Sequence, residues 1–170
     1  HSRTRRACSK PTAPPAVAQL PDSAQPVDLR WGGELALAGV DLYVEQPVTL
    51  PTLWFDLYWQ GASGPGGDTQ IRLVLLGADG QRWLDASQPC AVQPVAQDAA
   101  PGALLRSSQY LALPPGLPPG DYQLQVAVWD QARHLDGADL QTLAGLTLAG
   151  SGSWPVPPEW AFQGDFPVRF

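Results

Sequence analysis

The chain has 170 residues, of which 44% are hydrophobic and only 15% are charged. Its 17 glycines and 19 prolines exclude a helical bundle, because proline breaks helix interiors and glycine weakens them. The net charge of −6 opposes contact with phosphate backbones, so nucleic acid is not an expected partner.

Residues 1–25 show neither strand nor helix periodicity and are basic at the start, then rich in Pro and Ala. This composition is typical of an extended tether. The basic side chains at the start are Arg3, Arg5 and Arg6. They are expected either to lie beside an anionic membrane surface or to flank an upstream signal peptide or membrane helix. Because the chain starts at His1 and contains no Met, we expect a segment upstream of it. Both alternatives place the chain at a membrane, outside the cytoplasm.

The two cysteines are Cys8 and Cys90. In an oxidising compartment a disulfide between them would join the N-terminal arm to the body of the domain. Two alternatives remain open. Cys8 follows Ala7, as at the end of a bacterial lipobox, and would then carry lipid, or both cysteines are free thiols.

Strand patterns begin after the tether. Residues 27–31 alternate apolar and polar side chains, which is the period of a half-buried strand. After a Gly-Gly turn, residues 34–43 form the next predicted strand, and Leu35, Leu37 and Gly39 are expected to share one face.

The clearest strand pattern covers residues 52–60. One face is expected to hold Leu53, Phe55, Leu57 and Trp59, and the other to hold Trp54, Asp56 and Tyr58. A glycine-rich loop follows. Strands at 71–76 and 81–85 then flank a hairpin turn at 78–80.

Residues 86–103 are predicted to be a long polar connection, and strands follow at 105–113, 121–130 and 142–148. In 121–130, the side chains expected to point inward are Tyr122, Leu124, Val126 and Val128, whereas Gln123, Gln125 and Trp129 point outward. The Asp-Gly pair at 136–137 predicts a turn.

Short strands separated by turn signals predict an all-β fold. The expected architecture is an antiparallel two-sheet β-sandwich, immunoglobulin-like or jelly-roll-like, with about seven to nine strands in residues 26–149. Residues 150–170 form a tail rich in Pro and aromatic residues. Its last residues, 166–170, are either a final edge strand or the opening strand of a second copy of the domain.

Several segments are similar to a β-sandwich domain found after bacterial polytopic membrane glycosyltransferases of the dolichyl-phosphate-mannose-transferase type and in related surface proteins. The resemblance lies in residues 54–60 (WFDLYWQ), 71–85 with its Asp-Gly turn, 111–122 (LALPPGLPPGDY) and 126–130 (VAVWD). It covers about residues 27–148 and departs from the pattern in 86–103. It implies an accessory domain outside the cytoplasmic membrane, with no transferase residues.

No residue pattern predicts catalysis, a metal site or a cofactor. The histidines are His1, in the tether, and His134, in a predicted loop, and no Gly-x-Ser-x-Gly motif accompanies them. Asp136 and Asp139 flank a glycine but lack the alternating ligands of a calcium loop, so turn chemistry is the preferred interpretation.

Aromatic side chains are the candidate binding residues. The candidates on strands are Trp54, Tyr58, Trp83 and Trp129, and those in the tail are Trp154, Trp160 and Phe162. We predict a non-catalytic structural or assembly module that docks on a membrane or cell-surface protein complex. The alternative is a carbohydrate-binding accessory domain whose exposed rings stack on sugars.

Overall fold

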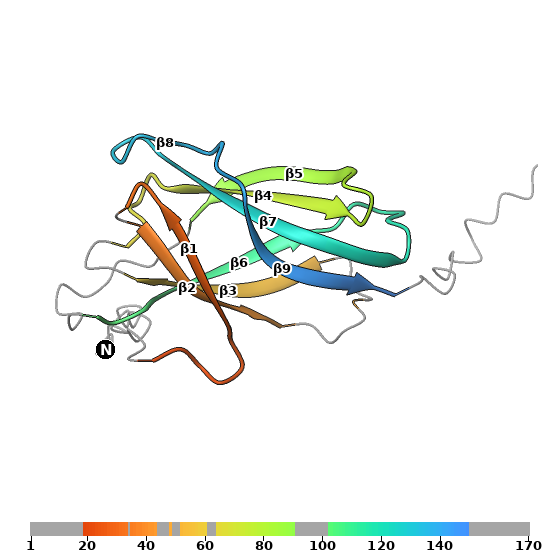
Figure 1. Cartoon of the computed structure of the whole chain (residues 1–170), viewed down its shortest axis with the longest axis horizontal. Helices are drawn as coiled ribbons and strands as arrows, with labels where there is room; N and C mark the ends of the chain where they lie inside the picture. Colours follow the sequence, from red (N-terminus) through yellow and green to blue (C-terminus); the bar gives the residue numbers. More distant parts are fainter. Residues whose placement is uncertain are drawn as a thin grey trace, which may run out of the picture.

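The computed structural model describes residues 19–33, 35–43, 48, 52–60, 64–90 and 102–149. Within these ranges the chain forms nine strands and no helix, arranged as two antiparallel sheets that pack face to face (Figure 1). The predicted all-β, two-sheet sandwich is therefore confirmed. No helix in the described part of the chain is long and apolar enough to cross a membrane.

The chain passes back and forth between the two sheets. The first sheet has the order β1 (Gln25–Trp31), β2 (Leu35–Leu42), β3 (Thr52–Gln60), β6 (Leu105–Ala112). The second has the order β5 (Arg82–Pro89), β4 (Gln70–Gly77), β7 (Gly120–Asp130), and β7 also pairs with β8 (Leu135–Asp136) and β9 (Gln141–Leu148). Strand β6 thus returns to the first sheet after the β4–β5 hairpin has formed part of the second.

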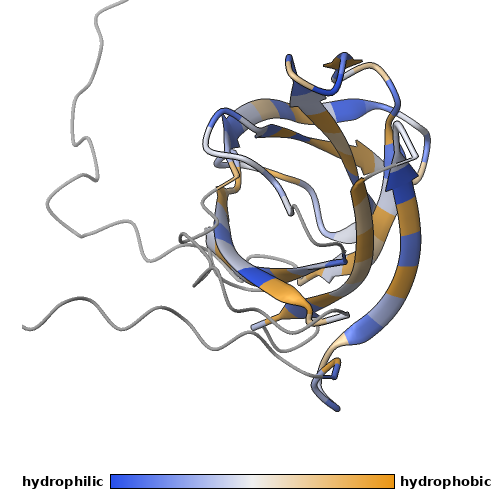
Figure 2. Ribbon diagram, turned by 90° about the vertical axis from the view of Figure 1, so that its left-hand side faces the viewer, coloured by the Kyte–Doolittle hydropathy of each residue, from blue (hydrophilic) through white to orange (hydrophobic). Residues whose placement is uncertain are grey.

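The hydrophobic core fills the space between the sheets, and the strands alternate hydrophobic and hydrophilic residues along their length (Figure 2). The inward side chains of β3 and β7 are those that the alternation predicts: Leu53, Phe55, Leu57, Trp59, Tyr122, Leu124, Val126 and Val128, each at most 5% exposed. Burial of apolar area at roughly 25 cal/mol per Å² is the main source of stability here.

A β-bulge in β2 changes which residues face the core. Leu37 pairs with Trp59 and Gly39 pairs with Tyr58, so Ala38 is an extra residue between the two pairs. The bulge reverses the inward and outward positions that follow it. Val40 therefore points into the core. The prediction that Gly39 shares a face with Leu35 and Leu37 is wrong: a side chain at Gly39 would collide with Leu20 outside the sandwich.

Two other boundaries differ from the sequence patterns. Strand β5 continues to Pro89, so residues 86–89 are part of the second sheet rather than of a polar connection. The alternation is hard to see there because β5 is an edge strand with small and polar side chains. Asp136, predicted as a turn residue, pairs with Trp129 in the short strand β8, and the turn begins at Gly137 with a φ of 72°.

Backbone and side-chain contacts join the two sheets along β9. Val48 N donates to Thr147 O at 2.7 Å, and Ala149 N donates to Val48 O at 3.0 Å. The indole nitrogen of Trp31 donates to Asp139 O at 3.0 Å. These contacts fix the first sheet against the second at one side of the sandwich.

Candidate functional site

Three exposed aromatic side chains lie in a row across the outer face of the first sheet; we call them the aromatic ladder. They are Tyr43, Trp54 and Tyr110, with 51%, 55% and 55% of their surface exposed. Trp54 and Tyr110 are register partners on β3 and β6, and their ring centroids are 5.4 Å apart. Tyr43 follows β2, and its backbone nitrogen donates to Trp54 O at 2.9 Å. Strands β3 and β6, together with the residue that follows β2, thus place three exposed rings on one face.

A buried carboxylate lies beneath the ladder. Asp56 has no exposed surface, and its Oδ2 accepts a hydrogen bond from the Tyr43 hydroxyl and forms an ion pair with Arg106 Nε at 2.5 Å. Burying a charge is costly unless it is paired and hydrogen-bonded. Here both partners are surface groups, because the Arg106 side chain is 42% exposed. Asp56 therefore orients an exposed ring and an exposed guanidinium from below.

The Tyr43 hydroxyl remains a donor across the physiological pH range. Burial of the hydroxyl, and then its hydrogen bond to Asp56, raise the pKa of Tyr43 above its ordinary value. The neutral phenol is therefore the form that donates to Asp56.

Tyr58 shares the outer face with Trp54, as the alternation predicts, but it is not accessible. Only 2% of its surface is exposed, because it packs in a small cluster with Ala24 and Leu104, and Leu20 and Ala38 lie against them. The segment before β1 crosses this part of the sheet and covers it. The prediction of Tyr58 as an exposed binding residue is therefore wrong.

Trp83 does not present a free ring either. It lies on the edge strand β5, is half-buried, and packs against the main core. As a candidate for an exposed binding ring, Trp83 is therefore only partly accessible. The register shifts between the Leu75–Leu84 and Leu76–Arg82 pairs, so Trp83 is an extra residue in β5, and such a bulge changes the direction of the side chain there.

Trp129 projects outward from β7 on the second sheet, as predicted, and is 38% exposed. It borders an open surface hollow of about 580 Å³, whose lining is Gly67, Asp68, Thr69, Gln70, Pro89, Trp129, Gln131 and Ala132. A second hollow of about 230 Å³ lies on its other side, lined by Gln70, Ile71, Arg72, Ser87, Trp129, Asp136 and Gly137. The indole thus separates two depressions on the same face.

A buried network supports the end of the sheet beside this hollow. The Thr69 hydroxyl donates to Asp130 Oδ2 at 2.7 Å, and Arg133 Nη1 binds the same oxygen at 2.5 Å. Arg133 also donates to the carbonyl oxygen of Gly64 at 3.0 Å. Burial raises the pKa of Asp130, but the hydrogen bonds from Thr69 and Arg133 outweigh it, so the pKa is lowered overall. Asp130 is therefore a charged group that joins Thr69, in the loop before β4, to Arg133, in the turn between β7 and β8.

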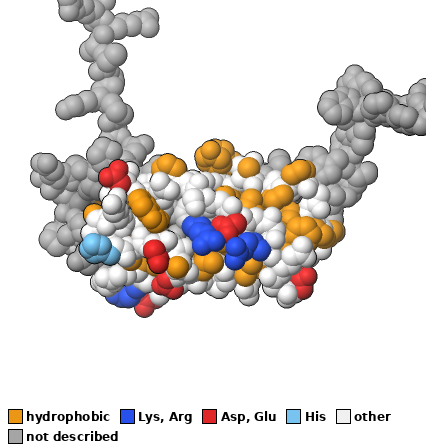
Figure 3. Space-filling model, turned by 90° about the horizontal axis from the view of Figure 1, so that it is seen from above, with side chains coloured by type: hydrophobic (Ala, Val, Ile, Leu, Met, Phe, Trp, Pro, Cys, Tyr) orange, Lys and Arg blue, Asp and Glu red, His pale blue; other side chains and the backbone are white. Residues whose placement is uncertain are grey.

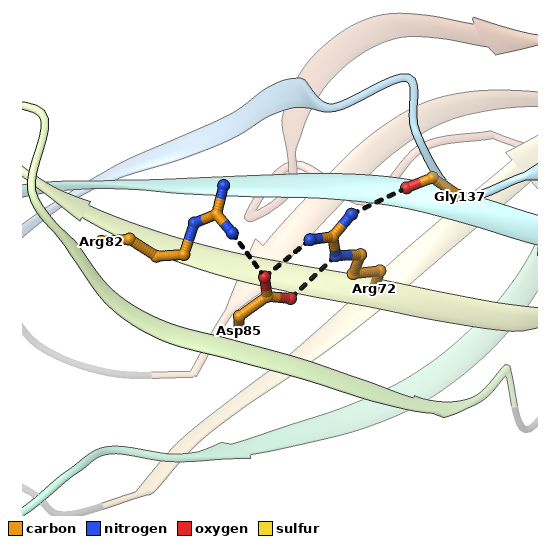
Figure 4. A network of polar contacts seen from close by, with 4 residues as sticks. All are labelled: Arg72, Arg82, Asp85 and Gly137. Atoms are coloured by element: carbon orange, nitrogen blue, oxygen red, sulfur yellow. Dashed lines mark hydrogen bonds and ion pairs between the residues drawn. The ribbon is translucent and has the colours of Figure 1, made fainter.

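The outer face of the second sheet also carries an ion-pair network (Figure 4). Asp85 on β5 accepts two hydrogen bonds from Arg72 on β4, at 2.8 and 2.6 Å, and one from Arg82 at 2.9 Å. Arg72 also donates to Gly137 O at 3.3 Å. The hydrogen bond from Arg72 holds the pKa of Asp85 below its usual range. Figure 3 shows one face of the molecule, where basic and acidic side chains gather near the middle and hydrophobic side chains lie around them.

Cys90 is a buried thiol, 4% exposed, at the end of β5. Its sulfur lies 3.7 Å from the Ser107 hydroxyl, which also accepts a hydrogen bond from the Trp59 indole at 2.9 Å. Burial raises the pKa of Cys90 to about 12. Cys8 lies outside the described residues, so its disulfide and its lipidation both stay predictions.

We expect Cys90 to be unreactive in the folded protein. A Cys8→Ser variant isolates this thiol, and Ellman's reagent at pH 8 should then label it only after denaturant is added. The reason is that the thiolate is the reactive form, and with a pKa near 12 it is nearly absent at pH 8. Rapid labelling of the native variant would show that the site opens readily.

The remaining polar candidates have ordinary structural roles. His134 is exposed in the turn between β7 and β8 with a φ of 56°. Asp136 accepts from Ala138 N at 2.9 Å, and Asp139 accepts from the Gln141 amide at 2.9 Å. Within the described ranges, no three His, Cys, Asp or Glu side chains gather where they could hold a metal ion.

The other predicted candidates, Arg3, Arg5, Arg6, Trp154, Trp160 and Phe162, lie outside the described residues. Two ladder residues, Tyr43 and Tyr110, were not among the sequence candidates. Tyr110 occupies an outward position in the alternation of β6, which is a signal that identifies it once β6 is known to be the neighbour of β3.

No family model and no curated protein matches this chain. Among solved structures, the crystal structure of chicken MD-1 complexed with lipid IVa is similar to it, with 14% sequence identity, 66% of this chain covered and 86% of that chain covered. The TM-score is 0.36, which is too low to carry an inference about function.

Proposed function

We propose that the chain is a non-catalytic module that docks on a membrane or cell-surface protein complex outside the cytoplasm. The observation that supports this function best is the aromatic ladder, with Tyr43, Trp54 and Tyr110 all more than half exposed. A contiguous group of exposed large rings on a sheet is a recognised mark of an interaction surface.

The composition of the ladder and its surroundings favours a protein partner. Trp, Tyr and Arg are the residue types most enriched at the energetic centres of protein interfaces. The ladder supplies the rings and Arg106 supplies the guanidinium, and Asp56 fixes two of these groups before any partner arrives. Groups that are already oriented lose less conformational entropy on binding, which increases affinity.

The proposed location draws on the sequence. The basic residues at the start of the chain and the resemblance to accessory domains of membrane glycosyltransferases both support a position outside the cytoplasmic membrane. The absence of a catalytic residue pattern supports a binding role rather than an enzymatic one.

Docking through the ladder is testable with the full chain, purified gently from its source membrane and analysed by native mass spectrometry. We expect a stoichiometric protein partner. Trp54→Ala should weaken its binding about 30-fold, the change that a loss of about 2 kcal/mol at an interface centre produces. Tyr110→Ala should have a similar effect, because the two rings are in contact.

Trp129→Ala is the matched control, since it removes an exposed indole from the opposite sheet. Docking through the ladder is excluded if the partner is retained equally by the Trp54→Ala and Trp129→Ala variants. It is also excluded if the native protein elutes as a free monomer.

A further inference from the structure

We propose that the hollow beside Trp129 on the second sheet is a binding site for a neutral oligosaccharide. This site is distinct from the aromatic ladder, because the two lie on the outer faces of different sheets. Saccharide binding here does not depend on the docking function, and the two can be tested separately.

The lining of the larger hollow has the chemistry that sugars require. Trp129 offers an apolar ring surface, on which the C–H face of a sugar ring can stack. The exposed amides of Gln70 and Gln131 carry both donors and acceptors, and Asp68 adds carboxylate acceptors. Hydroxyl groups are also both donors and acceptors, so they pair with such side chains in either direction.

The same lining disfavours other classes of small ligand. Among the described residues that line the larger hollow there is no Lys, Arg or His, and Asp68 brings a negative charge to it, so these residues offer a phosphate or carboxylate ligand no cationic partner. Its lining includes several polar side chains and it is open to solvent, whereas lipid chains require an enclosed apolar surface. A neutral, hydroxyl-rich ligand fits these conditions best.

The size and arrangement of the two hollows indicate more than one sugar residue. The larger hollow, at about 580 Å³, lies within the range of roughly 300–1,000 Å³ that is typical of small-molecule sites. Trp129 and Gln70 line both hollows. A chain of sugars stacked on Trp129 would therefore extend into both, with its further end near Ser87 and Arg72.

The surrounding backbone is held in place. Trp129 pairs with Gln70 on one side and with Asp136 on the other. The buried Thr69–Asp130–Arg133 network anchors the loop that carries Asp68 to the end of β7. Arg72, fixed by Asp85, also donates to the backbone at Gly137. The backbone that carries the indole therefore needs little reorganisation when a ligand binds, which favours binding.

The test uses three neutral probes, cellotetraose, chitotetraose and maltotetraose, titrated into the full chain by calorimetry and followed by saturation-transfer NMR. We expect at least one probe to bind. Trp129→Ala should weaken that binding about tenfold or more, which corresponds to a loss of about 1.4 kcal/mol of binding free energy. Trp129→Phe should retain most of the affinity, because it keeps an aromatic ring at this position. Gln70→Ala should reduce affinity with the indole still in place.

Trp54→Ala is the control, because it removes an exposed indole from the other sheet and should leave saccharide affinity unchanged. If Trp129→Ala does not fold, Gln131→Ala tests the same hollow from an exposed turn position. The site is refuted if none of the three probes, each at a concentration of about 10 mM, binds the unaltered chain. Such a result would mean that the dissociation constant is well above about 1 mM. It is also refuted if the Trp129 and Gln70 variants bind as well as the unaltered chain, or if binding is lost with Trp54→Ala instead.

Discussion

Replacing Trp59 by alanine is expected to lower the free energy of unfolding by about 3–5 kcal/mol, the range for removing a large aromatic side chain from a core. Trp59 has no exposed surface, and its ring lies against Trp31 with centroids 6.1 Å apart. Its indole nitrogen also donates to the Ser107 hydroxyl. The variant therefore creates a cavity between the sheets and removes a buried hydrogen bond. Urea unfolding followed by circular dichroism measures the loss.

Trp54→Ala is the matched control, since it removes the same type of side chain from the opposite face of the same strand, β3. Trp54 is 55% exposed, so we expect a loss of about 1 kcal/mol or less, as for most surface substitutions. A Trp59→Ala loss as small as that of Trp54→Ala would contradict the assignment of Trp59 to the core.

The second large effect is expected at Asp130. Asp130→Ala should cost about 3 kcal/mol, the lower end of the range for breaking a buried ion pair, because it removes the carboxylate that both the Thr69 hydroxyl and the Arg133 guanidinium contact. Asp130 is 3% exposed and binds the Thr69 hydroxyl and the Arg133 guanidinium. Chemical denaturation at pH 7 gives the loss. An Asp136→Ala variant, on the exposed side of the same hairpin, should cost much less.

The pH dependence of stability supplies an independent check on Asp130. Its pKa is lowered in the folded protein. A carboxyl of this kind contributes its full stability above its ordinary pKa of about 3.9, and the contribution is lost as the pH falls through the lowered value. An Asp130→Asn variant lacks this titration, so its stability should fall less steeply below about pH 4. Equal acid sensitivity of both proteins would show that Asp130 is not held as a charged group.

Much of the sandwich is predictable from local patterns. The two-residue alternation in β3 and β7 identifies every inward side chain of those strands, because each strand has one face on a shared core. The same alternation identifies Trp54 and Trp129 as outward, and both are exposed.

Other features depend on contacts that local patterns do not contain. The bulge at Ala38 shifts the alternation of inward and outward residues in β2. The sequence of β2 does not predict this bulge, because alanine and glycine are small enough for either face. Tyr58 is buried because a segment from before β1 crosses it. The ladder itself requires that β3 and β6 be neighbours, and these strands are far apart in the sequence. Alternation predicts which face of a sheet a side chain lies on, but it does not predict which strand or segment lies next to that side chain.

The pairing of β3 with β6 also has a consequence for the order of folding. The β4–β5 hairpin lies between them in the chain but belongs to the opposite sheet (Figure 1). The β1–β2, β2–β3 and β4–β5 pairs join consecutive strands and close short loops. In contrast, β6 can complete the first sheet only after a long loop has closed, which costs more chain entropy. Sandwiches dominated by such non-local pairings fold in roughly milliseconds to seconds, and we expect Tyr110 to join Tyr43 and Trp54 only when β6 pairs with β3.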